Sequence, residues 1–306
     1  MTTLTAAPAL SREPVQRITD DVGTLLRFLP GDVEALLRPI MDTVDEIKLR
    51  YGRPLMVLMG DRWEVFDEIT VDNDHLLDIN AKVMNWRDDG RKGVEGTCHR
   101  LYRTRNADGT IEGVTVRVGR FLQGVAWPLK PYLDEDASLL IMGTPGSGKS
   151  TLERDIARLI AEQIRAFCVI VDTSAELSGD GRRAHPGIGY ADRVQVAIKA
   201  QQADVIWEAV RSLNPRVLVV DEIGYADDAR VIRQASKLGV KTVATAHGNT
   251  FQDLVGNEAL SPVYDPPIFR WLVIVAARGV YHLYDLPKAM DRYRQGQVPA
   301  YRELRV

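Results

Sequence analysis

The sequence predicts an α/β protein in which a parallel sheet, covered by helices on both faces, follows a smaller α/β domain. Three observations lead to this prediction. From Ser138 onward, short apolar runs alternate with amphipathic helical segments, the pattern of strand–helix–strand units. Several of these runs are apolar throughout, which is typical of parallel strands buried on both faces. Before Ser138 the elements are shorter and include a strong β-hairpin signal.

The first half predicts short helices and strands. Apolar residues recur at helical intervals over residues 21–40, around a break at Pro30 and Gly31. The hairpin signal is Asn106-Ala-Asp-Gly109, which lies between two strand-like runs. The predicted elements are one or two strands over Val44–Leu58, a helix over Val71–Trp86 capped by Asp72 or Asp74, and hairpin strands over Leu101–Arg105 and Ile111–Val118.

The second half predicts a sheet whose strands end next to polar residues. The predicted strands are Leu139–Met142, Cys168–Val171, Val217–Val220, Val240–Ala244 and Trp271–Val275. Asp172, Asp221 and Thr245 each follow one of them. Because ligands of open α/β sheets bind at the carboxyl ends of the strands, we expect the functional site at this edge.

The chain of 306 residues is long for one hydrophobic core and suggests two domains. The Pro-containing stretch Trp127–Pro131 and the acidic residues 134–136 mark the expected junction. We expect a flexible tail at 1–14, an N-terminal α/β domain at 15–130, a larger α/β domain at 131–286, and an exposed, partly ordered tail at 287–306.

Composition excludes several classes of protein. The 39 Lys and Arg residues against 42 Asp and Glu residues give a net charge of −3, which provides no global attraction to nucleic acid or to an anionic membrane. Two cysteines, Cys98 and Cys168, cannot form a disulfide framework or a tetracysteine zinc site. The longest apolar run, Trp271–Ala277, is too short to span a bilayer. We expect a cytoplasmic protein that does not itself cross a membrane.

Residues 143–150 match the phosphate-binding pattern G-x-x-x-x-G-K-[ST] at every fixed position. Such a loop curls so that backbone N–H groups and the positive end of the following helix face phosphate oxygens. A predicted strand precedes this loop and an amphipathic helix, Thr151–Gln163, follows it. Lys149 is expected to reach the β- and γ-phosphates of ATP, and the Ser150 hydroxyl to ligate Mg²⁺. The predicted nucleotide-binding residues are Gly143, Thr144, Pro145, Gly146, Ser147, Gly148, Lys149, Ser150 and Thr151.

The apolar strand Val217–Val220 delivers a pair of carboxylates, Asp221 and Glu222, to the same edge. Asp221 is predicted to hold Mg²⁺ through its water shell. Glu222 is predicted to orient and deprotonate the attacking water. On its own this pattern is also typical of a plain transition from strand to loop. Together with the phosphate loop it favours ATP hydrolysis.

Other polar residues near the predicted edge have two interpretations each. Thr245 and His247 follow an apolar strand and are candidates to sense the γ-phosphate, but His247 equally fits a cap of a helix or turn. Asp172 and Glu176 are candidates to position Mg²⁺ or water, whereas the alternative for Asp172 is a cap of the next turn.

Phosphoryl transfer also needs a cation, commonly an arginine. Arg117 is the first candidate because it lies on the polar face of a strand whose other face is apolar. Arg120 is the second candidate, and Arg182 and Arg183 in a Gly-rich loop are the third. The alternative for all four is a solvated surface charge.

These segments resemble the stage III sporulation protein AA-like ATPases, including cyanobacterial and plastid-encoded members, within the secretion ATPase superfamily. The resemblance implies a RecA-like P-loop NTPase core after a small α/β domain, and a hexameric ring with nucleotide bound between the two domains. It also implies that His247 lies in the family's histidine box and Glu176 in its acidic box. The segments that carry it are Gly143–Ser150, Asp172–Gly179, His185–Gly189, Val219–Gly224 and Thr245–Thr250, with looser matches at Asp45–Pro54 and Val114–Arg120.

The leading hypothesis is a Mg²⁺-dependent ATPase ring that couples hydrolysis to protein secretion or assembly, with an unknown protein client or membrane-assembly platform as partner. The alternative is a nucleic-acid-stimulated ATPase or single-strand binder, because residues 87–120 contain eight Lys or Arg and five Asp or Glu, with Trp86, His99 and Tyr102 close in sequence. A further alternative is a slow, nucleotide-gated scaffold. A metabolite kinase is disfavoured because the sequence shows no obvious lid.

Overall fold

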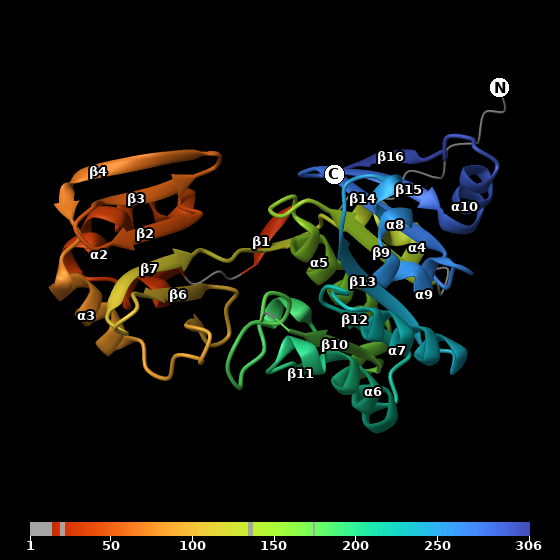
Figure 1. Cartoon of the computed structure of the whole chain (residues 1–306), viewed down its shortest axis with the longest axis horizontal. Coiled ribbons are helices and arrows are strands. Elements are labelled where there is room, and N and C mark those ends of the chain that lie inside the picture. The colour runs from red at the N-terminus through yellow and green to blue at the C-terminus, as the bar shows by residue number, and fades with distance from the viewer. Residues whose placement is uncertain (1–13, 19–21, 134–136, 174) are drawn as a thin grey trace.

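Two β-sheets organise the chain, one in each half (Figure 1). The structure is a computed structural model that describes residues 14–18, 22–133, 137–173 and 175–306. Residues 1–13 of the expected N-terminal tail and the acidic residues 134–136 of the expected junction lie outside the described residues.

The first sheet is antiparallel, with three helices on one face and the other face open. Alternate residues of β2, such as Ile47 and Leu49, are fully buried against these helices. Their neighbours Glu46 and Lys48 point to the open face. The strands, in sheet order, are β4 (Arg62–Thr70), β3 (Pro54–Met59), β2 (Glu46–Arg50), β7 (Ile111–Arg117), β6 (Arg100–Arg105) and β5 (Arg91–Gly93). The helices are α1 (Val22–Leu26), α2 (Gly31–Leu37) and α3 (Asn73–Lys82), with the 3₁₀ helix Arg38–Thr43.

The hairpin and the helix cap that the sequence predicted in this half are confirmed. β6 and β7 form the predicted hairpin, and Asn106 Oδ1 accepts hydrogen bonds from the Asp108 and Thr110 amides in its turn. Asp72 caps α3 by accepting a hydrogen bond from the His75 amide at 3.0 Å. The predicted helix Val71–Trp86 was too long, because Val83 takes an extended conformation and ends α3.

The second sheet contains the parallel strands that the sequence predicted. Leu140 and Met142 of β9 face a core with α6 and α7, while Leu139 and Ile141 face a second core with α5, so helices cover both faces. The strands, in sheet order, are β11 (Asp192–Gln195), β10 (Cys168–Asp172), β12 (Val217–Val220), β13 (Lys241–His247), β9 (Leu139–Gly143), β14 (Trp271–Ala277), β15 (Val280–Asp285) and β16 (Arg302–Arg305). The first six are parallel, and β15 and β16 are antiparallel additions.

Helices α5 (Lys149–Ile164), α6 (Gln202–Leu213) and α7 (Ala226–Lys237) are the long helices of this half. Shorter ones complete it: α8 (Phe251–Gly256), α9 (Ser261–Tyr264), α10 (Leu286–Arg294), and the 3₁₀ turns Arg165–Phe167, Pro186–Ile188, Lys199–Gln201 and Glu258–Leu260. Within the described ranges, no helix is long and apolar enough to cross a membrane.

The segment between the two halves packs with the second one. Phe121, Ala126 and Leu129 are fully buried in the core beneath α5. The elements here are β8 (Phe121–Gln123), which pairs with β1 (Gln16–Ile18), the 3₁₀ helix Trp127–Leu129, and α4 (Lys130–Leu133). We therefore propose that the domain junction lies near residues 119–120 rather than at 130–131.

The C-terminal segment differs from the expected exposed tail. It forms α10 and then β16, which pairs with β15 and extends the sheet. Tyr301 stacks on His282 with ring centroids 4.1 Å apart, and Leu304 packs against the core beneath α5. An unpaired edge at β15 would expose a row of backbone hydrogen-bonding groups, and β16 covers them.

Candidate functional site

The phosphate loop joins β9 to α5 in the conformation that the motif requires. Gly146 and Gly148 have φ values of +77° and +103°, a region that favours glycine. A Cβ at either position would meet no heavy atom within 4 Å, so the concave side of the loop is open. Ser147 Oγ is buried and has no hydrogen-bond partner among the described residues. An open loop at a helix N-terminus, with an unsatisfied hydroxyl, fits a phosphate.

Lys149 and Ser150 begin α5 and face the same cavity. Lys149 Nζ donates hydrogen bonds to the carbonyl oxygens of Gly143 at 2.8 Å and Thr144 at 3.1 Å. Burial lowers the Lys149 pKa, whereas the carboxylates of Glu222, Glu153 and Asp221 act to raise it. The ammonium group therefore lies in a partly desolvated site where an anionic ligand is favoured.

Glu222 follows β12 in a strained backbone conformation. Its φ of +47° is unusual for a residue other than glycine. Three contacts hold its peptide groups: its amide donates to Thr245 Oγ1 at 3.0 Å, and its carbonyl accepts from Lys199 Nζ at 2.5 Å and Gln202 Nε2 at 3.1 Å. Asp221, the residue before it, is 5% exposed at the end of the strand. Strain of this kind concentrates at functional sites.

His247 lies between the phosphate loop and Glu222. It ends β13, which separates β9 from β12 in the sheet, and it pairs in register with Gly143. His247 Nε2 is 3.3 Å from Glu222 Oε1, and both side chains are partly exposed. Among the residues that the structure describes, His247 therefore contacts Glu222. The sequence had also suggested that His247 caps a helix or turn.

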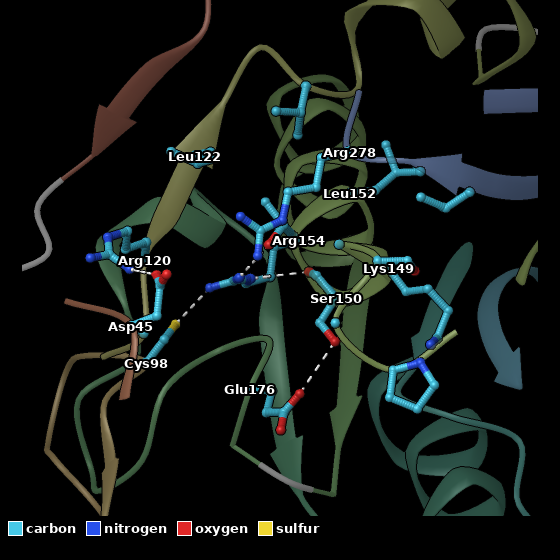
Figure 2. A pocket seen from close by; sticks show the side chains of 18 of the residues that line it. Asp45, Cys98, Arg120, Leu122, Lys149, Ser150, Leu152, Arg154, Glu176 and Arg278 are labelled. Atoms are coloured by element: carbon cyan, nitrogen blue, oxygen red, sulfur yellow. Dashed lines mark hydrogen bonds and ion pairs between the residues drawn. The ribbon is translucent and has the colours of Figure 1, made fainter. Parts of the chain in front are cut away.

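Glu176 and Asp172, the two acidic candidates after β10, have different surroundings. Ser150 Oγ donates to Glu176 Oε2 at 3.3 Å (Figure 2). Arg100 forms an ion pair with Glu176. Asp172 is 1% exposed and accepts hydrogen bonds from the Ser178 amide and hydroxyl and from the Glu176 amide. Burial raises the pKa of Asp172, while those bonds lower it. Asp172 therefore caps the turn that carries Glu176, as in its alternative interpretation.

The arginine candidates differ in whether they line the cavity and in what they bind. Arg117 lines the cavity and its Nε lies 3.0 Å from Glu46 Oε2. Arg120 also lines it, but its guanidinium is bound to Asp45 and to the carbonyls of Asp42 and Val44, which removes it as a phosphate ligand. Arg182 and Arg183 are exposed residues whose amides bind Glu95, outside the cavity.

Arg100 was missed in the sequence. It pairs in register with Arg117, so the two guanidinium groups share the open face of the first sheet. Burial, together with the positive charges of Arg117 and Arg91, lowers its pKa to about 10. The register of the hairpin could have identified Arg100 from the sequence, because the Asn106–Gly109 turn sets Arg100 opposite Arg117.

Glu153 was also missed, because the charges of α5 were assigned to an exposed face. Asp155 and Arg158 are buried as well, and Asp155 Oδ2 accepts a hydrogen bond from the Ala126 amide. Glu153 is fully buried and neither carboxylate oxygen has a hydrogen-bond partner in the described part of the chain. Burial, and then the charges of Asp221 and Asp172, raise its pKa well above the usual value.

A cavity of about 530 Å³ lies between the first sheet and the phosphate loop (Figure 2). The first sheet contributes Glu46, Arg100 and Arg117, and the second half contributes residues 145–152 and Glu176. This volume lies in the range of small-molecule sites, about 300–1,000 Å³. Phosphate-binding groups, the acidic residue Glu176 and arginines thus face one space, whereas Asp221, Glu222 and His247 lie outside the residues that line it.

The fold is that of the secretion ATPases. The structure of the pilus retraction motor PilT with bound ADP is similar with a TM-score of 0.59, at 16% identity over 78% of this chain and 76% of that one. The Legionella pneumophila ATPase DotB is similar with a TM-score of 0.53, at 17% identity over 81% and 76%.

The chain belongs to the family described as sporulation stage III, protein AA, whose sequence profile matches residues 90–282. It is 37% identical to the ycf45 protein of Porphyra purpurea, 36% to SEEDLING PLASTID DEVELOPMENT 1 of Arabidopsis thaliana, and 29% to the stage III sporulation protein AA of Bacillus subtilis. These matches cover 80%, 79% and 79% of the chain. The chain spans 44% and 36% of the first two relatives and 87% of the third.

Proposed function

We propose that the protein is a Mg²⁺-dependent ATPase. The observation that carries this proposal is the placement of Glu222: a carboxylate held by a strained backbone, in contact with His247, at the sheet edge that also bears the phosphate loop. A carboxylate directly after the metal-binding aspartate suits activation of water.

The phosphate loop, Gly143 to Thr151, holds the triphosphate through backbone amides and Lys149. Ser150 and Asp221 hold Mg²⁺, because hydroxyl and carboxylate oxygens are the ligands it takes in such sites. When bound, Mg²⁺ neutralises charge on the β- and γ-phosphates. Glu176, hydrogen-bonded to Ser150, orients the hydroxyl.

Glu222 accepts the proton of the attacking water, and His247 fixes the direction of that carboxylate. Arg117 and Arg100 face the phosphate loop across the cavity and supply the positive charge that phosphoryl transfer requires. The ion pair of Arg100 with Glu176 links the first sheet to the loop after β10.

The test is ATP turnover by the wild type and by Glu222→Gln, with ATP binding measured separately. Turnover should fall by at least about 100-fold in the variant, while ATP affinity changes by less than about threefold, because the substitution removes only the base. Equal turnover in both proteins would remove Glu222 as the base. ATP binding with no turnover in the wild type would favour the slow, nucleotide-gated scaffold.

We further propose that the chain works as a hexameric ring and drives a protein secretion or assembly process. The similarity of its fold to a pilus retraction motor supports this proposal. Mass photometry with Mg²⁺ and ATP should reveal a hexamer. A chain that stays monomeric under these conditions would contradict the ring.

A second candidate function is binding of single-stranded nucleic acid. The open face of the first sheet has a second cavity of about 390 Å³ that contains four arginines and an exposed tyrosine: Arg50, Arg91, Arg100, Arg117 and Tyr102. Cations beside an aromatic ring fit a single strand. Fluorescence anisotropy with labelled oligo-dT should show binding that weakens steeply with salt and is lost in Arg91→Ala; salt-independent or absent binding would eliminate this function.

A further inference from the structure

Five arginines line the cavity at the phosphate loop, and four of them are engaged. Arg100, Arg117 and Arg120 form ion pairs with Glu176, Glu46 and Asp45, and Arg154 donates to Ser150 O, Thr151 Oγ1 and Cys98 Sγ. The fifth, Arg278, makes no hydrogen bond or ion pair with any residue that the structure describes. Figure 2 shows its side chain extending into the cavity above Arg154.

The sheet brings Arg278 to the phosphate loop. β14 runs parallel to β9, and Ile274 pairs in register with Met142, so both strands end at the same edge. Arg278 and Gly279 form the turn after β14, and Gly279 has a φ of +76°. The amide of Val306, just after β16, donates to the Gly279 carbonyl at 3.0 Å, which ties the turn to the edge strand.

Apolar side chains lie next to this turn. Val275 and Tyr281 face each other across β14 and β15 at the base of the turn, and both are 3% exposed. The Tyr281 hydroxyl donates to the Val125 carbonyl at 3.0 Å, which joins the segment after β8 to the same wall. Val125, Val275 and Tyr281 all line the cavity. The site therefore combines an apolar wall with a planar cation.

We propose that Arg278 binds the purine base of the nucleotide by stacking its guanidinium plane on the ring, with Val125, Val275 and Tyr281 forming the apolar wall of the base site. The inference rests on the proposed function, since Arg278 lines the same cavity as Lys149, Ser150 and Thr151, the residues proposed to hold the phosphates. Arginine stacks on flat aromatic groups and keeps its charge under all physiological conditions.

The same geometry sets the selectivity for the base. The carboxylates that line the cavity, Asp45, Glu46 and Glu176, are each paired with an arginine. No unpaired carboxylate in the described part of the cavity accepts the N–H groups of guanine. A site that stacks a ring without reading its edge discriminates weakly, so ATP and GTP should bind with affinities within about tenfold of each other.

The experiment is calorimetric titration of the full chain with three Mg²⁺-bound ligands: ATP, GTP and inorganic tripolyphosphate. Glu222→Gln serves as the background, so that ATP is not consumed. Arg278→Ala removes the guanidinium, and Arg278→Lys keeps the charge but removes the plane. Arg305→Ala is the matched control, because Arg305 is an exposed arginine of the neighbouring β16 that pairs with Glu303. Thermal melting checks that all variants fold.

Both Arg278 variants should weaken ATP and GTP binding about tenfold, because a partly desolvated cation–π contact is lost. Both should leave tripolyphosphate binding unchanged. An equal loss for tripolyphosphate would place Arg278 on the phosphates and overturn the proposal. Unchanged ATP affinity, full rescue by lysine, or a preference above about 100-fold between ATP and GTP would overturn it as well.

Failure of the proposed function has a different signature. If the background protein binds neither ATP nor tripolyphosphate, the phosphate site itself is wrong and the base site falls with it. If it binds tripolyphosphate as tightly as ATP, the phosphate site stands and only the base site at Arg278 is rejected.

Discussion

Glu222 shows how single side chains determine the geometry of the site. A left-handed conformation costs a residue with a side chain about 1–2 kcal/mol, so the surrounding contacts must hold it. Lys199 supplies one of these contacts, since its ammonium group donates to the Glu222 carbonyl at 2.5 Å and to the Gln202 amide oxygen at 2.9 Å. Within the described residues, all three hydrogen bonds of its ammonium group go to protein oxygens, those of Asp221, Glu222 and Gln202. Lys199 is a positioning residue.

Lys199→Ala should lower kcat about tenfold and leave KM for ATP within about twofold, because the peptide of Glu222 loses one of its donors while the phosphate loop stays intact. Lys199→Arg, which restores a donor, should recover part of the loss. Steady-state kinetics measures both, and Lys237→Ala, an exposed lysine at the end of α7, is the control. A matching rise in KM for Lys199→Ala would indicate a general structural defect instead.

Glu153 lowers stability at the centre of the same site. A buried carboxyl without hydrogen bonds costs about 1–3 kcal/mol, and here Asp221 and Asp172 add unfavourable charge. Glu153→Leu should therefore raise the free energy of unfolding. Because the folded protein holds this proton to a higher pH than the unfolded chain does, the wild type loses stability as pH rises above about 4.3, by up to about 1.4 kcal/mol per pH unit.

Urea denaturation of both proteins at pH 5 and pH 8 measures this effect. The advantage of Glu153→Leu over the wild type should be larger at pH 8. Glu208→Leu, at an exposed position of α6, is the control and should change stability by less than about 0.5 kcal/mol. A wild type that is more stable than Glu153→Leu at pH 8 would show that the carboxylate has a favourable partner.

At the scale of elements, the loop after β10 connects the two sheets. Asp180 accepts hydrogen bonds from the Gly93 amide at 2.9 Å and from Arg87 Nη2 at 3.2 Å, both from the first half. A Cβ at Gly93 would lie 2.2 Å from the Asp180 Cβ, so the two segments are in close contact. The same loop carries Glu176, so its position depends on this junction.

Asp180→Ala should destabilise the protein by about 1–3 kcal/mol, since the Gly93 amide loses its acceptor. Amide hydrogen exchange of residues 176–183 should become faster, because the loop loses its contacts with the first sheet. Denaturation and hydrogen exchange by mass spectrometry measure the two effects. Asp192→Ala, an exposed residue of β11, is the control. Unchanged exchange in this loop would show that Asp180 does not hold it.

Local signals explain why some elements could be predicted and others could not. The phosphate loop, the Asn106–Gly109 hairpin and the Asp72 cap depend on residues within a few positions of each other, and the sequence predicted all three. The strand β16 depends on an edge of β15 that exists only in the folded sheet, so its residues resembled a polar tail. The contact of His247 with Glu222 could not be predicted, because it depends on the sheet order, which places β13 between β9 and β12.

The same reasoning applies to the site as a whole. Arg278 follows β14 and Arg100 lies in β6, and neither has a motif around it. They reach one cavity only because the two halves of the chain meet at the phosphate loop. Glu153 looked like an ordinary helical charge because only the folded sheet places it near Asp221 and Asp172, at the ends of β12 and β10.

At the scale of the whole molecule, the arrangement of the two halves bears on how a ring would work. In a ring, the arginine that phosphoryl transfer needs can come from the same chain or from a neighbouring subunit. In this structure Arg117 and Arg100 line the cavity at the phosphate loop of their own chain. A site whose phosphate loop and arginines come from one chain needs no neighbour to complete its positive charge.

We therefore expect that Arg117 acts within its own chain, which a mixing experiment can test. Arg117→Ala and Lys149→Ala chains carrying two different tags are co-expressed, and rings with both variants are isolated through both tags. If each site uses its own Arg117, no chain in such a ring is intact, and turnover should stay at the sum of the two variants alone. Rings of wild type and Lys149→Ala, isolated in the same way, should keep turnover from their wild-type chains. Recovery of activity in the doubly mutant rings would mean that Arg117 of one chain completes the site of the next, and that the site is shared between subunits despite the geometry of the single chain.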